Sequence, residues 1–98
     1  MAYRVKAAKR VLKYLKKENN RQLKKKFADI IYDDLAKDPY IGEEKHGDLR
    51  GYYTVGFNYQ RTAYRIAYTI NDDGEIVIVV LVGSHEKFYE QLKRIIKG

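Results

Sequence analysis

The fold is decided by residues 61–82, whose sequence RTAYRIAYTINDDGEIVIVVLV predicts two strands joined by a turn. Large apolar side chains alternate with small or polar ones over residues 61–70, which is typical of a strand with one buried face. That buried face carries Tyr64, Ile66, Tyr68 and Ile70. Asn71-Asp72-Asp73-Gly74 is a strong turn signal, and residues 76–82 form an unbroken apolar run that suits a strand in mid-sheet, buried on both faces.

Outside this pair of strands the apolar spacing becomes helical. Residues 7–18 predict one helix, whose apolar stripe is Ala8, Val11, Leu12 and Leu15. Asn19-Asn20 is a short break and a helix cap, and a second helix ends before Asp38-Pro39. Its apolar stripe is Leu23, Phe27, Ile30, Ile31 and Leu35. The two helices should form an antiparallel hairpin, and a final helix is expected over residues 85–97.

The remaining segments complete an α+β architecture in one domain, residues 1–98. Residues 51–57 are rich in strand formers and should pair with residues 61–70, with 58–60 between them. Residues 42–50 are polar and predict a loop, and residues 3–6 fit a short first strand. We therefore expect the helical hairpin to pack on one face of an antiparallel sheet of three or four strands, followed by a C-terminal helix.

Composition narrows the functional classes. The 98-residue chain has 45% hydrophobic residues and no cysteine, which excludes a disulfide framework and cysteine nucleophiles. Two histidines alone cannot build a zinc site, so no metal or cofactor is expected. The chain shows no apolar signal region and no run long enough to span a bilayer, so we expect a cytoplasmic protein.

The net charge of +7 is concentrated at one end. Residues 1–26 hold eleven Lys or Arg and one acidic residue, for a local charge of +10. A basic region of this kind suits a polyanion, most often nucleic acid, or an acidic protein partner. A solvated helix face would show the same pattern.

The second face of the strand 61–70 carries a candidate anion site. It presents Ala63, Arg65, Ala67 and Thr69, so one long cation stands between two small alanines. An arginine above such a floor makes a concave positive spot suited to a phosphate. The alternative is a surface arginine paired with an acidic neighbour, Asp48 or Glu75.

A second candidate cluster follows the apolar strand. In a helix from residue 85, His85 and Tyr89 would share a face, with Lys93 near its edge. Histidine and a phenol can exchange protons, and with Arg65 they would suffice for metal-free RNA cleavage by the 2′-hydroxyl. A helix-start histidine and a packed aromatic would give the same pattern. Other tyrosines that could stack on bases are Tyr52, Tyr53 and Tyr59.

In order, these features resemble the RelE/ParE superfamily of type II toxin–antitoxin toxins over nearly the whole chain. The matching pieces are the basic helical hairpin, LRGYY at 49–53, YRIAY at 64–68 and GSHEKFY at 83–89. The glycine-x-histidine ending with a later aromatic looks closest to the YafQ-like branch. The resemblance implies an endoribonuclease toxin that cleaves mRNA, usually on the translating ribosome, until a cognate antitoxin binds it.

The resemblance also assigns roles to single residues. Arg65 matches the strand arginine at the scissile phosphate, His85 the candidate general acid, and Tyr89 the aromatic that orients or activates the nucleophile. We also expect supporting RNA contacts from His46, Arg50, Arg61 and Lys93, although no motif of the family fixes these four positions. The general base is left open between His46 and Tyr89.

The chain departs from RelE at Thr54 and Gly56, where RelE has lysines, and in the 58–61 loop, which looks about two residues longer. Two other functions remain open: a ParE-like inhibitor of DNA gyrase, and a noncatalytic basic module that binds RNA or protein. For the antitoxin we expect an acidic or amphipathic helix, folding on the helices of residues 7–37 and the sheet edge. A toxin–antitoxin hetero-oligomer would result.

Overall fold

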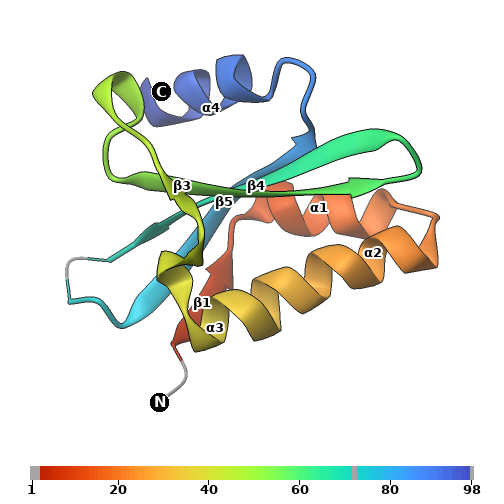
Figure 1. The fold of residues 1–98 in the computed structure, drawn as a ribbon, viewed down its shortest axis with the longest axis horizontal. Coiled ribbons are helices and arrows are strands. Elements are labelled where there is room, and N and C mark those ends of the chain that lie inside the picture. Colours follow the sequence, from red (N-terminus) through yellow and green to blue (C-terminus); the bar gives the residue numbers. More distant parts are fainter. Residues whose placement is uncertain (1–2, 72, 98) are drawn as a thin grey trace.

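A five-stranded sheet lies between two helical layers in the computed structural model, which describes residues 3–71 and 73–97 (Figure 1). The strands are β1 (Arg4–Ala7), β2 (Glu43–Glu44), β3 (Tyr52–Tyr59), β4 (Thr62–Ile70) and β5 (Ile76–Ser84). The helices are α1 (Lys9–Lys17), α2 (Arg21–Ala28), α3 (Leu35–Lys37) and α4 (Phe88–Lys97). The sheet order is β1-β5-β4-β3-β2.

The α+β class is confirmed, but the sheet has more strands than the three or four expected, and one pair is parallel. β1 pairs in parallel with β5, with Arg4 opposite Ile76. β2 is a two-residue edge strand, with Glu43 opposite Thr54. Two charged residues carry no strand pattern, and the partner of β1 lies about 70 residues away in the chain, so local sequence marks neither pairing.

The helical hairpin forms as predicted, with one residue of its stripe misplaced. The Asn20 side chain caps α2 by accepting hydrogen bonds from the backbone N–H groups of Gln22 (3.0 Å) and Leu23 (3.1 Å). α1 starts at Lys9, since Ala7 still belongs to β1. Leu12 was predicted to face the core but is 50% exposed.

α2 continues through a π-helical turn, Asp29–Asp34, directly into α3. The buried residues along this length are Leu23, Phe27, Ile31 and Leu35, at a strict spacing of four. In an α-helix of 3.6 residues per turn each such step rotates the stripe by about 40°. The wider π turn takes up this rotation and keeps all four side chains against the sheet.

A large aromatic core lies between the hairpin and the sheet. Phe27, fully buried, makes edge-to-face contacts with Tyr14, Phe57 and Tyr64 at centroid distances of 5.7, 5.1 and 5.7 Å. Tyr68, also fully buried, donates a hydrogen bond to the Pro39 carbonyl oxygen (2.6 Å). The predicted buried face of the strand 61–70 is thus confirmed at Tyr64, Ile66 and Tyr68, whereas Ile70 is half-buried and belongs to neither core.

A smaller core covers part of the opposite face under α4 (Figure 1). It comprises Leu49, Ala67, Leu81, Phe88 and Leu92. β5 therefore contributes to both cores, as its unbroken apolar run predicted. Ala67 is fully buried here, so the expected open floor of two alanines around Arg65 is reduced to Ala63.

Several predicted boundaries were wrong because single residues adopt left-handed backbone. β3 runs on to Tyr59 and β4 starts one residue late, at Thr62, because they meet in a two-residue turn where Gln60 and Arg61 have φ of 48° and 68°. α4 begins at Phe88 instead of residue 85, since Lys87 has φ of 57° and cannot continue a helix.

The predicted loop at 42–50 contains β2 and a short 3-10 helix, Gly47–Leu49. Of the predicted turn at 71–74, Asp72 lies outside the described residues. The Asn71 side chain accepts hydrogen bonds from the backbone N–H groups of Glu75 and Ile76, both at 2.9 Å. Gly74 has φ of 68°, a left-handed conformation that glycine adopts without strain.

Candidate functional site

Arg65 lies in an open part of the sheet because both of its cross-strand neighbours are glycines. It stands opposite Gly56 on β3 and Gly83 on β5. A Cβ atom at Gly56 would lie 3.2 Å from Arg65 Nη1, a tight contact that would push the guanidinium aside by a few tenths of an ångström. Glycine at 56 therefore gives the guanidinium room to lie over β3.

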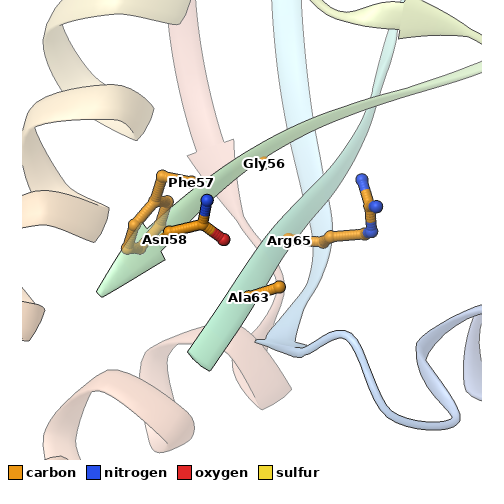
Figure 2. Close-up of a pocket in the computed structure, with 5 residues that line it drawn as sticks. All are labelled: Gly56, Phe57, Asn58, Ala63 and Arg65. Atoms are coloured by element: carbon orange, nitrogen blue, oxygen red, sulfur yellow. The ribbon is translucent and has the colours of Figure 1, made fainter. Parts of the chain in front are cut away.

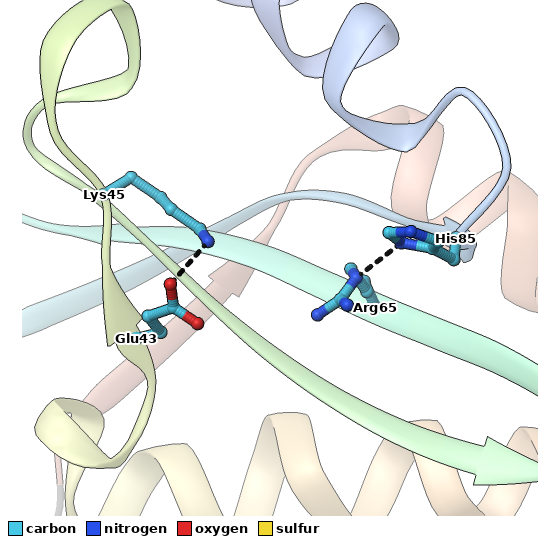
Figure 3. Close-up of polar contacts among 4 residues, drawn as sticks. All are labelled: Glu43, Lys45, Arg65 and His85. Atoms are coloured by element: carbon cyan, nitrogen blue, oxygen red, sulfur yellow. Dashed lines mark hydrogen bonds and ion pairs between the residues drawn. The ribbon is translucent and has the colours of Figure 1, made fainter.

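His85 accepts a hydrogen bond from Arg65. The distance from Arg65 Nε to His85 Nδ1 is 2.8 Å (Figure 3). The backbone N–H of His85 donates to the Ala63 carbonyl oxygen (2.7 Å), which fixes the end of β5 beside β4. Because Nδ1 accepts here, the neutral ring carries its own proton on Nε2, which is left free for another partner.

Tyr89 completes the cluster from the first turn of α4. Its ring meets the His85 ring edge-on at a centroid distance of 6.1 Å, and Arg65 Cζ lies 5.7 Å from its centroid. The prediction that His85 and Tyr89 lie together holds, although its premise of one shared helix was wrong. The turn at Lys87 brings the two rings together instead.

Sequence reasoning missed Lys45, which reaches the same cluster from the polar segment after β2. Its Nζ atom lies 5.0 Å from the centroid of the Tyr89 ring and 3.0 Å from Glu43 Oε1 (Figure 3). Its side chain is only 17% exposed. No spacing or motif pointed to this lysine, because its partners lie on β2 and α4.

Electrostatics couple Lys45 to its neighbours. Partial burial acts to lower the pKa of Lys45, but hydrogen bonding to Glu43 and then to Tyr89 raises it overall. The pKa of Glu43 is lowered, chiefly by its hydrogen bond to Lys45, and the charge of Arg65 adds to the effect. Lys45 therefore stays charged, and the cluster holds two cations beside one phenol.

The other predicted RNA contacts are His46, Arg50, Arg61 and Lys93, and all four side chains are exposed. Within residues 3–71 and 73–97, none of them makes a side-chain hydrogen bond or ring contact with the cluster. The structure thus brings together the three predicted catalytic residues but not these four. Of the two candidate bases, Tyr89 lies at the cluster and His46 does not.

The structure also shows which residue Arg65 contacts and where two of the tyrosines expected to stack on bases lie. Arg65 bonds to His85 instead of to an acidic neighbour. The Tyr59 hydroxyl donates toward Asn20 Oδ1 and Gln22 Oε1, both at 3.1 Å, on the hairpin side. Tyr53 stacks on Tyr68 at 5.5 Å in the aromatic core.

Beside Arg65 the surface of the β3–β4 pair is hollowed into an open depression of about 290 Å³. Its lining is Gly56, Phe57, Asn58, Ala63 and Arg65 (Figure 2). The depression and the cluster share the Arg65 side chain, so they form one continuous polar region on the sheet face that α4 leaves partly open.

Residues 4–93 match the family model described as the ParE-like toxin of the type II bacterial toxin–antitoxin system. This chain belongs to that family. A search among curated proteins found no match.

Solved structures give particular relatives. The chain is similar to the isolated RelE toxin of E. coli, with 28% identity, a TM-score of 0.59, and coverage of 96% of this chain and 99% of that one. It is also similar to a chain of the intact E. coli RelBE toxin–antitoxin complex, with 27% identity, TM-score 0.60 and coverage of 84% and 95%. A chain of the Mycobacterium tuberculosis RelBE2 complex shares the fold at TM-score 0.73, with 20% identity and coverage of 87% and 100%.

The helices were also compared with the length and hydropathy that a bilayer requires. Among the residues the structure describes, no helix is long and apolar enough to cross a membrane.

Proposed function

We propose that this chain is an endoribonuclease toxin that cleaves mRNA on the translating ribosome. The observation that carries the proposal is the contact of one half-buried arginine, Arg65, with both His85 and Tyr89. An anion binder, an imidazole and a phenol within one cluster are the groups that phosphodiester cleavage by a 2′-hydroxyl needs. A gyrase inhibitor that acts by binding alone would not require this set.

In the proposed reaction the 2′-oxygen of the substrate loses its proton and attacks the adjacent phosphorus. The bond from phosphorus to the 5′-oxygen then breaks, which leaves a 2′,3′-cyclic phosphate and a 5′-hydroxyl. Arg65 binds the phosphate and stabilises the charge that builds up in the transition state. Lys45, held at the Tyr89 ring, adds a second positive charge. It compensates for Thr54 and Gly56, which are uncharged where RelE has lysines.

His85 supplies the proton for the leaving 5′-oxygen. In the free protein its Nδ1 atom is occupied by Arg65 Nε. A bound phosphate competes for the guanidinium and frees Nδ1, so that the ring can take up a proton there and pass one to the leaving oxygen. Tyr89, in contact with both cations, is the group best placed to orient or accept the proton of the 2′-hydroxyl.

The proposed partner is a cognate antitoxin, as in the RelBE complexes to which the chain is similar. The outer surface of α1 and α2 carries exposed lysines and arginines, with Leu12 half exposed among them. An acidic amphipathic helix would match both the charge and the apolar residue. We place the toxin and its antitoxin in the cytoplasm, where translating ribosomes are found.

The test is primer extension on an mRNA in a reconstituted translation system, comparing wild type with His85→Ala and His46→Ala. We expect ribosome-dependent cuts that fall by about a hundredfold or more in His85→Ala, the usual loss for a general acid. His46→Ala should lose far less. The same message without ribosomes is the control.

Cuts on naked RNA would keep the nuclease and remove the ribosome from the proposal. Full activity of His85→Ala would remove His85 from the mechanism. An absence of cuts together with inhibited DNA supercoiling would assign the chain to gyrase, and an absence of both would leave a binding module.

A further inference from the structure

The depression beside Arg65 is lined by residues of β3 and β4 (Figure 2). β4 runs between β3 and β5 in the sheet. His85 follows β5, whereas Gly56 and Asn58 belong to β3. The depression therefore adjoins the proposed reaction centre, with which it shares the Arg65 side chain.

The floor of the depression carries almost no side-chain atoms. Gly56 has none and Ala63 has only a methyl group, and both lie on the Arg65 face of the sheet. The Phe57 ring is turned into the aromatic core, where it contacts Phe27 at 5.1 Å and Tyr64 at 5.6 Å. A flat floor of this kind suits a flat ligand.

Arg65 connects the depression to the proposed phosphate site. Its Nε atom is directed to His85, while Nη1 lies above Gly56, 3.2 Å from the position a Cβ atom would take there. One guanidinium therefore borders both places. Guanidinium planes stack on unpaired bases in single-stranded RNA, so a base next to the bound phosphate would lie against Arg65.

Asn58 is the other polar side chain of the lining. It is exposed, and no side-chain hydrogen bond from it is found within the described residues. Its amide offers one acceptor and two donors, the pattern that pairs with two adjacent polar atoms of adenine. The volume of about 290 Å³ is near the lower limit of small-molecule sites, about 300 Å³, which is suitable for a single base.

We propose that this depression is a nucleobase subsite, which takes the base next to the cleaved phosphodiester and in which Asn58 selects adenine. The inference rests on the proposed nuclease function, to which it adds a sequence preference. Phosphate contacts position a nucleic acid, whereas contacts to base edges specify its sequence, so Arg65 and Asn58 divide these two tasks.

The first test maps cut sites on a pool of mRNAs for wild type, Asn58→Ala and Asn58→Asp. Wild type should favour adenine at one fixed position next to the cut. Both variants should lose that preference at least fivefold, because alanine has no polar group and a carboxylate lacks the amide donor. Total cleavage should fall less than tenfold. Asn19→Ala, an exposed asparagine in the α1–α2 connection, is the matched control and should cut as wild type does.

The second test does not depend on cleavage. Isotope-labelled protein is titrated by NMR with a 2′-deoxy dinucleotide containing adenine, which lacks the attacking hydroxyl. Backbone amide shifts are expected at Gly56, Asn58 and Ala63, and Ala63→Leu, which fills the floor and leaves Arg65 and His85 in place, should abolish them.

The two readouts separate the subsite from the nuclease. Cleavage with an unchanged preference in both Asn58 variants overturns the subsite and leaves the nuclease. No cleavage, with dinucleotide shifts that Ala63→Leu removes, overturns the nuclease and supports the subsite. No cleavage and no shifts overturn both. Shifts that persist in a folded Ala63→Leu protein place the dinucleotide elsewhere and overturn the subsite.

Discussion

The two faces of the sheet differ in what their side chains do, although they share the same strands. On the hairpin face, aromatic and aliphatic side chains from α1, α2 and four strands pack around Phe27 and Tyr68. On the other face a small core under α4 covers one part, and the rest is open around Arg65. Along β4, Ile66 is fully buried in the first core, while its neighbour Arg65 faces the site.

This division means that stability and the proposed chemistry depend on different residues of one strand. The period of two in β4 separates them, because successive side chains point to opposite faces. Substitutions on the hairpin face should change the free energy of unfolding and leave the site intact in the folded protein. Substitutions on the open face should do the reverse.

The largest effect is expected at Phe27. Phe27→Ala removes a fully buried ring with three edge-to-face contacts and should lower the free energy of unfolding by about 3–5 kcal/mol. Urea unfolding measures this. Tyr32→Ala, at an aromatic residue 45% exposed on the adjoining π-helical turn, is the control and should stay within about 0.5 kcal/mol. Equal losses in both variants would contradict the asymmetry of the faces.

Arg65 should show the opposite behaviour. Arg65→Ala should lower cleavage by about a hundredfold or more, the usual loss of one charge-stabilising group, with stability changed by less than about 0.5 kcal/mol. Arg65→Lys should recover only part, because an ammonium group lacks the planar fork that binds a phosphate through two parallel hydrogen bonds. Arg94→Ala, an exposed arginine on α4, is the control. If Arg65→Ala instead lowered the free energy of unfolding substantially, Arg65 would have a structural role and the loss of cleavage would not test its chemistry.

Lys45 should have a smaller effect on the open face. Lys45→Ala should lower kcat on the order of tenfold, since it removes the second cation at Tyr89 but leaves Arg65. Glu43→Gln should lower kcat less, because it loosens Lys45 without removing its charge. Single-turnover cleavage separates this from weaker binding. A change in KM alone would make Lys45 an RNA contact instead.

Tyr68 gives the hairpin face a pH dependence. Burial raises the pKa of Tyr68 from 10.0 to about 12, so the folded state keeps its proton while the unfolded state loses it. This contribution to stability is complete below pH 10 and is lost as the pH rises toward 12. Tyr68→Phe should be less stable by about 1–2 kcal/mol at neutral pH and show a shallower alkaline decline in urea unfolding. Parallel pH curves for the two proteins would exclude Tyr68 as the cause.

The smallest effect is expected in the β3–β4 turn. Gln60 and Arg61 both have positive φ, which suits Asn-Gly far better than these side chains. Gln60→Asn with Arg61→Gly should stabilise the fold by about 0.5–1 kcal/mol, as thermal unfolding would show. RNA binding should weaken if Arg61 contacts RNA as proposed, and Gln60→Asn alone is the control for that effect.

The sequence predicted what local periodicity encodes. Alternation placed Tyr64, Ile66 and Tyr68 in the core, and the four-residue spacing from Leu23 placed the second helix. The sequence pattern could not show that β1 pairs with β5, because that contact joins two segments far apart in the chain. Lys45 escaped prediction for the same reason, since only the fold brings it to Tyr89.

The parallel pairing of β1 with β5 also has a consequence for the timing of synthesis. β1 is made first, but the strand it pairs with ends at Ser84, and His85 and Tyr89 follow still later. A nascent chain exposes its basic helical hairpin long before its last strand and helix emerge. The cluster of Arg65, His85 and Tyr89 is therefore completed only at the end of synthesis, whereas the hairpin that we propose as the antitoxin surface is made before it.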